Sequence, residues 1–210
     1  MCYHLKMSSM KGLLYSGGIE STYLLQKLEG TIQPVYVKFG FQWEKPELKV
    51  SRNNVKRTEN SRDLIVINVE HEDPSRLRKS HLDKDEQYYT YIHGRTSSII
   101  TNSVIELNCM EINEFYEGTL GGGEDETFPD STREFYDKLE ETLSIGLNDE
   151  IKIRTPLIGN TKKDIIKEMR NMDIGVDDTI SCVGNDKAEK CGECYKCNKR
   201  KKILKSVSEK

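Results

Sequence analysis

The chain has 210 residues with 32% charged residues and a formal net charge of -3, which fits one α/β domain with a small appendage. The acidic balance argues against a protein whose main task is to clamp nucleic acid, and no stretch approaches the roughly 20 apolar residues of a membrane span. The opening "MCYHLKMSSMKG" lacks the apolar core of a secretory signal, so we expect a cytoplasmic protein.

Short apolar runs alternate with helix-compatible segments along the chain. We expect strands at residues 11–15, 32–40, 64–69, 111–118 and 151–157. Helices are expected at 21–28, between 41 and 60, at 96–107, 131–143 and 162–172, and in the basic tail. Because strands that alternate with helices form parallel βαβ units, the sequence predicts a Rossmann-like α/β fold with helices on both faces of a parallel sheet.

Polar residues mark the starts of two of these helices. Ser131 and Glu134 have the spacing of a capping box, which predicts Ser131 as the cap of the helix at 131–143. Thr161 is expected to cap the helix that begins at Lys162. The charged residues 70–86 are expected to form a solvated loop or a polar helix.

The segment "LYSGGIEST" (14–22) places two glycines directly after the first expected strand. Adjacent glycines allow a sharp turn and expose backbone N–H groups, and the hydroxyls and helix start that follow complete a cup for an anion. The segment is not a Walker A motif, because no lysine follows the glycines. An ordinary strand-to-helix turn with Ser21 as the N-cap is the alternative.

Four of the six cysteines gather near the C-terminus, at Cys182, Cys191, Cys194 and Cys197. Without an export signal, clustered cysteines bind metal more often than they form disulfides. Two consecutive C-x-x-C steps, completed by Cys182, predict a closed tetrahedral zinc site that supports the fold rather than the chemistry. An iron–sulfur cluster and free thiols are the alternatives. Nearby cations are expected to offset the thiolate charge: Lys190, Lys196, Lys199 and Arg200.

The glycine loop resembles the S-G-G-x-D-S signature of the PP-loop ATP pyrophosphatases. Together with the cysteines it is most similar to the 7-cyano-7-deazaguanine (preQ0) synthases. Four further segments support the resemblance in the family's order: "HGRTSS", "EGTLGGGEDETFPDSTREF", "TPLIGNTKKDII" and "SCVGNDKAEKCGECYKCNKR". The likeness extends from Tyr15 to Arg200.

The resemblance implies a fold, a reaction and an assembly. It implies a HUP-type PP-loop nucleotide-binding domain over residues 1–160 and a helical, zinc-binding region over 161–210. It implies that 7-carboxy-7-deazaguanine and ammonia become 7-cyano-7-deazaguanine through adenylated intermediates, in queuosine or archaeosine biosynthesis, with ATP, Mg²⁺ and Zn²⁺. The family also tends to form homodimers.

The resemblance also implies roles for particular residues. ATP is expected to contact Arg95 and the loop with the start of its helix: Ser16, Gly17, Gly18, Glu20, Ser21 and Thr22. The predicted catalytic residues are Ser16, Glu20, Ser21 and Lys162. Asp130 and Phe128 are expected to bind the deazapurine, and the four cysteines to bind zinc. A solvated lysine at 162 and a turn aspartate at 130 are the alternatives.

Some residues depart from the family pattern. Glu20 stands where the family has Asp, and Thr96 follows Arg95 where Asn is usual. The segment "KFGFQWEKPE" replaces a Gly-Gln-Arg-His pattern, and "GGGEDE" is one residue longer than its counterpart. His93 is expected to be structural, and the tail to be an exposed helix face rather than a tRNA contact.

Two other functions are alternatives. A PP-loop ligase or thiolase that modifies tRNA needs a basic surface or an added domain, for which a chain of this size and charge has little room. A non-catalytic adenine-nucleotide-binding protein is the second alternative, and the change from Asp to Glu20 would mark such a loss of activity.

Overall fold

The computed structural model describes residues 10–70, 91–121, 128–184 and 190–208. Apart from Glu70, the charged segment 70–86 lies outside these residues, as does most of "GGGEDE". Within the described ranges, no helix has the length and apolar character needed to cross a membrane.

Five strands and six α-helices alternate along the described chain. In chain order they are β1 (Lys11–Leu14), α1 (Ile19–Lys27), β2 (Ile32–Lys38), α2 (Glu44–Arg57), β3 (Ile65–Asn68), α3 (Arg95–Asn108), β4 (Glu114–Tyr116), α4 (Arg133–Leu147), β5 (Lys152–Arg154), α5 (Lys162–Asn171) and α6 (Tyr195–Ser208). Short 3₁₀ turns lie at Pro129–Ser131 and Val176–Asp178. Every strand and helix expected in these ranges is present, with shifted bounds.

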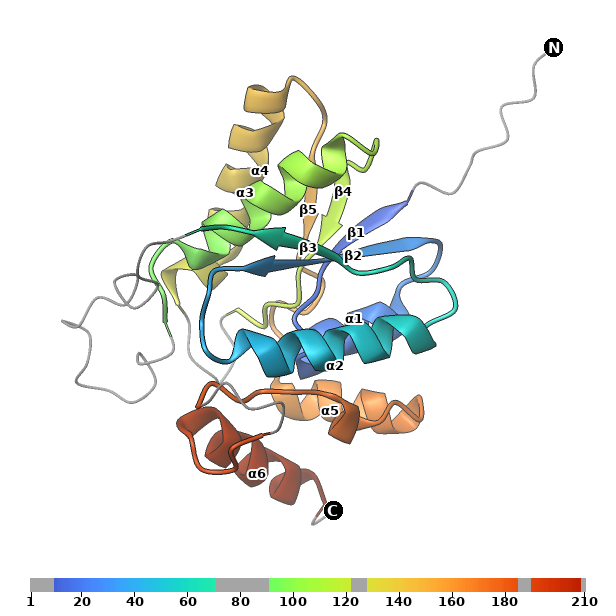
Figure 1. The fold of residues 1–210 in the computed structure, drawn as a ribbon, viewed down its shortest axis with the longest axis vertical. Coiled ribbons are helices and arrows are strands. Elements are labelled where there is room, and N and C mark those ends of the chain that lie inside the picture. The colour runs from blue at the N-terminus through green and yellow to red at the C-terminus, as the bar shows by residue number, and fades with distance from the viewer. Residues whose placement is uncertain (1–9, 71–90, 122–127, 185–189, 209–210) are drawn as a thin grey trace.

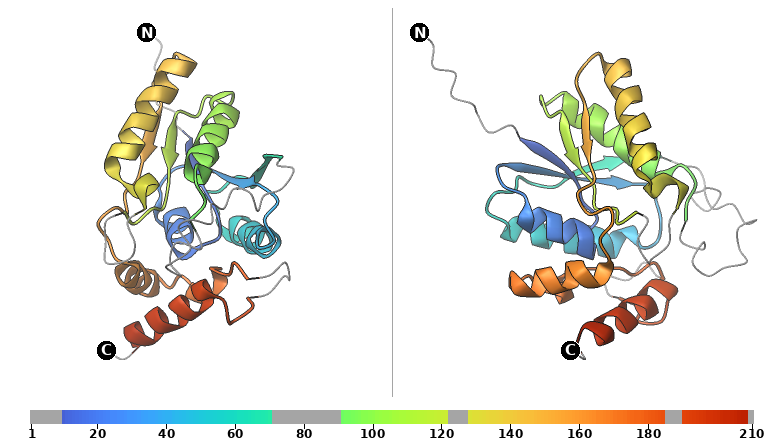
Figure 2. Two further views of the ribbon diagram at one scale, coloured as in Figure 1. Left: turned by 90° about the vertical axis from the view of Figure 1, so that its left-hand side faces the viewer. Right: turned by 180° about the vertical axis from the view of Figure 1, so that it is seen from behind.

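The strands form one parallel sheet in the order β3-β2-β1-β4-β5. Helices α1 and α2 cover one face of the sheet, and α3 and α4 cover the other (Figure 1). Helices α5 and α6 form a further layer beyond α1 and α2, as both views in Figure 2 show. This arrangement confirms the predicted Rossmann-like sheet. Successive strands are added on one side of β1 up to β3 and on its other side from β4 onward. Open α/β sheets bind ligands at such a switch point, here between β1 and β4.

Two apolar cores hold the layers together. One lies between the sheet and helices α1, α5 and α6, and the other between the sheet and α3 and α4. The central strands pack closely because Gly12 on β1 has no side chain: a Cβ there would lie 2.7 Å from the Phe115 ring on β4. Burial of apolar side chains on both faces explains why these strands read as nearly continuous apolar runs.

Helix α1 begins earlier than the sequence indicated. Its N-cap is Gly18 and its first residue is Ile19, so Ser21 lies inside the first turn. The alternative in which Ser21 caps the helix is therefore wrong. Successive side chains of an α-helix point about 100° apart around its axis. The earlier start therefore also decides which side chains of α1 face the end of the sheet.

Helix α4 is capped by Thr132, whose Oγ1 accepts a hydrogen bond from the Phe135 N–H at 3.2 Å. The predicted capping box of Ser131 and Glu134 is wrong by one residue, because Pro129 starts a 3₁₀ turn that includes Ser131. The Ser131 hydroxyl instead donates to the Phe128 carbonyl at 2.8 Å.

Helix α5 begins as predicted. Thr161 caps it and forms a reciprocal capping box with Asp164. This cap fixes the start of α5, and with it the direction of the side chain of Lys162, the first residue of the helix.

Candidate active site and cysteine cluster

A cavity of about 230 Å³ opens where β1, β2 and β4 end and α1 and α3 begin. Its polar lining comes from elements far apart in the sequence and includes Ser16, Glu20, Ser21, Tyr36, Arg95, Thr96 and Glu117. Its apolar wall includes Val35, Val37, Ile99 and Ile100. A second cavity of about 200 Å³ shares Glu20 and Arg95 with the first and is also lined by Gly18, Glu47, Lys162 and Lys196. The two cavities together form one candidate site.

The glycine loop forms a tight polar turn at this site. The Ser16 and Ser21 hydroxyls lie 3.3 Å apart, and the Gly18 N–H donates to Ser16 Oγ at 3.4 Å. The Ser21 hydroxyl also donates to the Gly18 carbonyl at 3.4 Å. The loop therefore presents hydroxyls and the N-terminus of α1 to the first cavity, which is an arrangement that suits an anion.

Gly17 faces helix α2 rather than the cavities. Its φ of 72° is in the left-handed region, and a Cβ there would lie 2.9 Å from Ser51 Oγ and 3.3 Å from Val50 Cγ1. Its carbonyl accepts a hydrogen bond from the Ile180 N–H at 2.8 Å. Gly17 thus shapes the loop and joins it to the segment that precedes Cys182.

Thr22 lies on the core side of α1. Its side chain is buried, and its hydroxyl is 3.2 Å from the Tyr15 hydroxyl. Thr22 and Gly17 were expected to contact ATP, but neither is in the lining of the two cavities.

Glu20 and Lys162 form an ion pair inside the site. Lys162 Nζ lies 2.8 Å from Glu20 Oε1, and the side chains are only 23% and 17% exposed, respectively. Burial alone would raise the pKa of Glu20, but the Lys162 ammonium outweighs it and the pKa is lowered. A Cβ on Gly118 would lie 3.0 Å from Glu20 Cβ, so the glycine lets the end of β4 pack against this part of α1.

Arg95 is the first residue of α3 and reaches both cavities. Gly94 precedes it with a φ of 72°, which turns the chain into the helix. The Nε atom of Arg95 is buried and has no hydrogen-bond partner in the described part of the chain. Because a buried guanidinium N–H without a partner is costly, Arg95 is suited to an anionic ligand in the cavity.

Two half-buried acids in the site, Glu47 and Glu117, were not found from the sequence. Glu47 on α2 accepts a hydrogen bond from the Tyr36 hydroxyl at 2.6 Å. Burial raises the pKa of Glu47 to about 7, although Arg95 and Tyr36 act in the opposite direction. The only signal in the sequence was an acidic residue in the first turn of the helix that follows the second strand. Many exposed helices have such a residue.

The second acid, Glu117, directly follows β4. Its Oε2 accepts hydrogen bonds from the Thr119 N–H at 2.7 Å and from the Tyr136 hydroxyl at 2.9 Å. Burial raises the pKa of Glu117 to about 7. Its position at the carboxyl end of a predicted strand was the signal that could have identified it.

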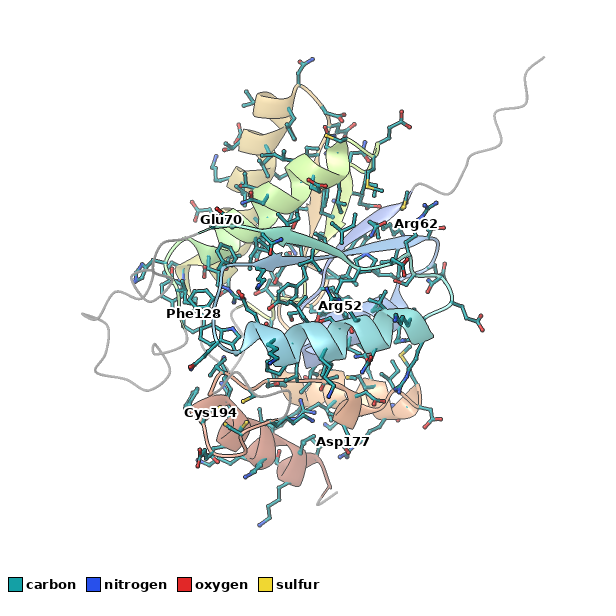
Figure 3. All side chains as sticks on the ribbon, in the orientation of Figure 1. Arg52, Arg62, Glu70, Phe128, Asp177 and Cys194 are labelled. Atoms are coloured by element: carbon teal, nitrogen blue, oxygen red, sulfur yellow. The ribbon has the colours of Figure 1, made fainter. Side chains whose placement is uncertain are left out.

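One of the two predicted substrate residues, Asp130, contacts the lining of the first cavity. Asp130 has a pKa raised by burial and hydrogen-bonds the side chain of Thr96, which lines that cavity. The Phe128 ring stacks on Tyr91 with centroids 5.0 Å apart and an interplanar angle of 4°. Figure 3 shows Phe128 on the side of the molecule where β2 and β3 end. Asp130 thus contacts a residue of the first cavity, but neither Asp130 nor Phe128 lines either cavity. His93 packs against Tyr91, as expected for a structural residue.

The four C-terminal cysteines come together. Their sulfur atoms all lie within 4.8 Å of one another. Backbone N–H groups of Gly184 and Cys191 donate to Cys182 Sγ at 3.5 and 3.3 Å, and Cys194 donates to Cys191 Sγ at 3.4 Å. Figure 3 shows Cys194 beside α6. Four sulfurs so placed fit a single tetrahedral metal ion such as zinc.

Arg200 was expected to offset the thiolate charge, and it lies within electrostatic range of Cys197. Its guanidinium is buried and donates to Thr179 Oγ1 at 2.8 Å and to Ser181 Oγ at 3.4 Å. It therefore fastens α6 to the segment before Cys182. Of the other expected cations, Lys190 donates to the Asp177 carbonyl, and Lys196 lines the second cavity.

Comparison with known proteins decides between the families that share this fold. The family model described as "Queuosine biosynthesis protein QueC" matches residues 12–208. The chain belongs to this family.

Named relatives agree over most of the chain. A 7-cyano-7-deazaguanine synthase of Pseudoalteromonas translucida is 25% identical over 198 residues, which cover 90% of each chain. The synthase of Pyrococcus abyssi is 23% identical and covers 91% of each chain. That of Methanosphaera stadtmanae is 39% identical over 79 residues, which are 37% of this chain and 34% of the relative. The resemblance inferred from the motifs is confirmed.

Proposed function

We propose that the chain is a carbon–nitrogen ligase that uses ATP to convert 7-carboxy-7-deazaguanine and ammonia to 7-cyano-7-deazaguanine in queuosine biosynthesis. The observation that carries this proposal is the match to the QueC family along residues 12–208. It is supported by a site in which a hydroxyl-rich loop, the ammonium of Lys162 and an Arg95 N–H that has no partner among the described residues line two adjoining cavities.

The reaction needs ATP because a carboxylate is a poor electrophile. Its negative charge repels nucleophiles, and its oxygen cannot leave as oxide. Attack of the carboxylate on the α-phosphorus of ATP forms an acyl-adenylate and releases pyrophosphate. Ammonia then displaces AMP to give the amide. A second adenylation, at the amide oxygen, makes that oxygen a leaving group, and loss of AMP and the amide protons gives the nitrile.

The protein's contribution is to position the reactants and stabilise charge. Ser16, Gly18 and Ser21 are proposed to hold phosphate oxygens at the start of α1. Arg95 and Lys162 are proposed to bind the same phosphates from the other side, with Lys162 fixed by Glu20. Gly17 and Thr22 act indirectly, through the shape of the loop and the packing of α1. Mg²⁺ accompanies ATP and offsets phosphate charge.

We assign the adenine ring of ATP and the deazapurine ring of the substrate to different parts of the site. The apolar wall of Val35, Val37, Ile99 and Ile100 suits a flat adenine ring. Asp130 is proposed to accept hydrogen bonds from the N–H edge of the deazapurine. Phe128, already stacked on Tyr91, is proposed to offer an aromatic surface beside that ring.

The remaining expectations are proposed on the family resemblance. Cys182, Cys191, Cys194 and Cys197 would hold Zn²⁺, which would stabilise the C-terminal region without taking part in the reaction. Residues 1–160 would form the nucleotide-binding domain and 161–210 the helical, zinc-binding region. The protein would be a cytoplasmic homodimer that does not contact nucleic acid directly, and its product could also serve archaeosine biosynthesis.

Pyrophosphate release tests the proposal and separates it from the alternatives. We expect release from ATP and Mg²⁺ only when 7-carboxy-7-deazaguanine is present. Release that requires tRNA would indicate a tRNA-modifying enzyme, and binding of ATP without any release would indicate a nucleotide-binding protein. Lys162→Met should reduce release strongly, whereas Lys163→Met, at the exposed neighbouring position, should not.

A further inference from the structure

Hydrogen bonds to three other residues hold Glu117 in place, one through its backbone and two through its carboxylate. Its backbone N–H donates to the Arg154 carbonyl at 2.9 Å, which extends the pairing of β4 with β5. Its Oε2 accepts hydrogen bonds from Thr119 and from Tyr136 on α4. The residue lines the same cavity as Ser16 and Glu20. Glu117 therefore presents a carboxyl group of fixed orientation to the first cavity.

The charges around Glu117 are predominantly negative. Glu20 on α1 and Asp130 in the 3₁₀ turn both raise its pKa, and Tyr136 is its nearest polar partner from α4. Arg154 on β5 pairs with Glu114 instead. Arg95 on α3 also lines this cavity, and Lys162 on α5 lines the adjoining one. The site therefore combines cations suited to phosphate with a carboxylate region suited to a small cation.

We propose that Glu117 binds the ammonium ion and accepts its proton, so that neutral ammonia attacks the activated carboxyl carbon. This role rests on the proposed function, in which ammonia is the nucleophile. Glu117 lies within electrostatic range of both Glu20, beside the proposed phosphate site, and Asp130, beside the proposed deazapurine site. The acyl carbon of an adenylate joins these two halves of the ligand.

For each amide formed, Glu117 takes one proton from ammonium. One N–H bond of ammonium breaks, its proton moves to the Glu117 carboxylate, and its electron pair becomes the lone pair of ammonia. The new C–N bond forms, and the bond between the acyl carbon and the bridging oxygen breaks with its electrons, releasing AMP. The nitrogen loses one more proton to solvent, and Glu117 returns its proton to solvent before the next turnover.

The pKa values of Glu117 and Glu20 suit the two carboxyl groups to different tasks. Burial raises the pKa of Glu117 to about 7, whereas Lys162 keeps Glu20 ionised. A base titrating near the working pH can both accept and release a proton in each cycle. Neighbouring carboxyls whose pKa values are pushed apart commonly have distinct roles in catalysis.

Glu117→Gln tests this role, because the amide keeps the size and can still accept from Thr119 and Tyr136. Adenylation, measured as pyrophosphate released in one turnover without ammonium, should stay within about twofold of wild type. Ammonium-dependent amide formation should fall by about 100-fold or more. Hydroxylamine is neutral near pH 7 and needs no base, so hydroxamate formation should be nearly normal. Glu114→Gln, three residues earlier on β4 and paired with Arg154, is the matched control.

A second variant keeps the test independent of that substitution. Tyr136→Phe removes a hydrogen bond that lowers the pKa of Glu117, so the rise of amide formation with pH should move to higher pH. Normal amide formation in Glu117→Gln, an equal loss with hydroxylamine, or an unmoved pH profile would contradict the role. Absence of adenylation in the wild-type chain would instead overturn the proposed function, and this role with it.

Discussion

The cysteine cluster and the cavities at the sheet edge are assembled in opposite ways. The cluster draws its four sulfurs from one short segment, residues 182–197, and backbone N–H groups already bond two of the sulfurs. The cavities draw their groups from elements between Leu14 and Lys196, and Arg95 Nε is buried with no hydrogen-bond partner among the described residues. A closed set of ligands suits a structural metal, whereas incomplete hydrogen bonding suits a substrate that comes and goes.

The two regions are nevertheless connected. The Ile180 N–H donates to the Gly17 carbonyl, and Arg200 on α6 holds Thr179 and Ser181. Ile180 and Ser181 also line the second cavity. The cluster should therefore support the shape of the loop without touching its ligand.

The largest effect is expected from breaking the cluster. Cys194→Ser removes one of four thiolates, and because metal binding and folding are linked, the variant should lose its metal and unfold at a much lower temperature. Cys109→Ser, at an exposed lone cysteine, should retain both properties. Elemental analysis and thermal unfolding check this. A Cys194→Ser chain with full metal content would remove the distinction between the two regions.

The next effect concerns the loop. Gly17→Ala forces a side chain into the left-handed region and within 2.9 Å of Ser51 Oγ, so ATP affinity should fall about tenfold, or 1.4 kcal/mol. Adding Ser51→Ala should restore part of the affinity by removing the contact, while Ser51→Ala alone should change little. Equilibrium ATP binding measures all three variants. Unchanged affinity in Gly17→Ala would show that the loop tolerates another backbone shape.

An effect of similar size, on turnover rather than on affinity, is expected from the ion pair. Glu20→Gln removes the partner that fixes Lys162, so turnover should fall by about tenfold while ATP binding is nearly retained, because positioning matters most as charge moves to pyrophosphate. Glu20→Asp leaves a gap of one methylene and should be partly active. Steady-state kinetics and ATP binding separate these effects. If wild type is inert and Glu20→Asp is active, the chain is a nucleotide-binding protein.

A different kind of effect concerns the pH dependence of stability. The pKa of Glu47 is about 7 in the folded chain, above its ordinary value of 4.5, so the folded state binds the proton more tightly than the unfolded state. Its ionisation therefore destabilises the fold above about pH 7, and this penalty disappears as pH falls toward about 4.5. Chemical denaturation should show that Glu47→Gln reduces the loss of stability as pH rises from about 4.5 to about 7. An identical pH dependence in both chains would contradict this.

Local patterns predicted much of this molecule. The Thr161 cap, the alternating strands and helices, and the cysteine spacing each depend on residues close in sequence. The cap of α4 was misplaced because Pro129 adds a turn that the capping pattern did not reveal. Thr22 lies outside the lining of the two cavities, because α1 starts at Ile19 and the Thr22 hydroxyl faces Tyr15, which the sequence pattern did not reveal.

Long-range packing decided what the sequence did not reveal. Gly17 is required by Ser51, more than thirty residues away in the chain, as well as by the turn itself. Glu117 becomes part of the site only because β4 lies beside β1 and α4 brings Tyr136 to its carboxyl group. Such contacts depend on strand order, which no spacing within one segment specifies.

Mass spectrometry of the products tests the central claim most directly. The chain should be incubated with ATP, Mg²⁺, ammonium and 7-carboxy-7-deazaguanine, and the deazapurine and nucleotide products identified together. We expect 7-cyano-7-deazaguanine, with AMP and pyrophosphate formed in a ratio of two each to one nitrile, since both the acid and the amide are adenylated. Unchanged 7-carboxy-7-deazaguanine with intact ATP, from protein that is folded and contains its metal, would contradict the claim.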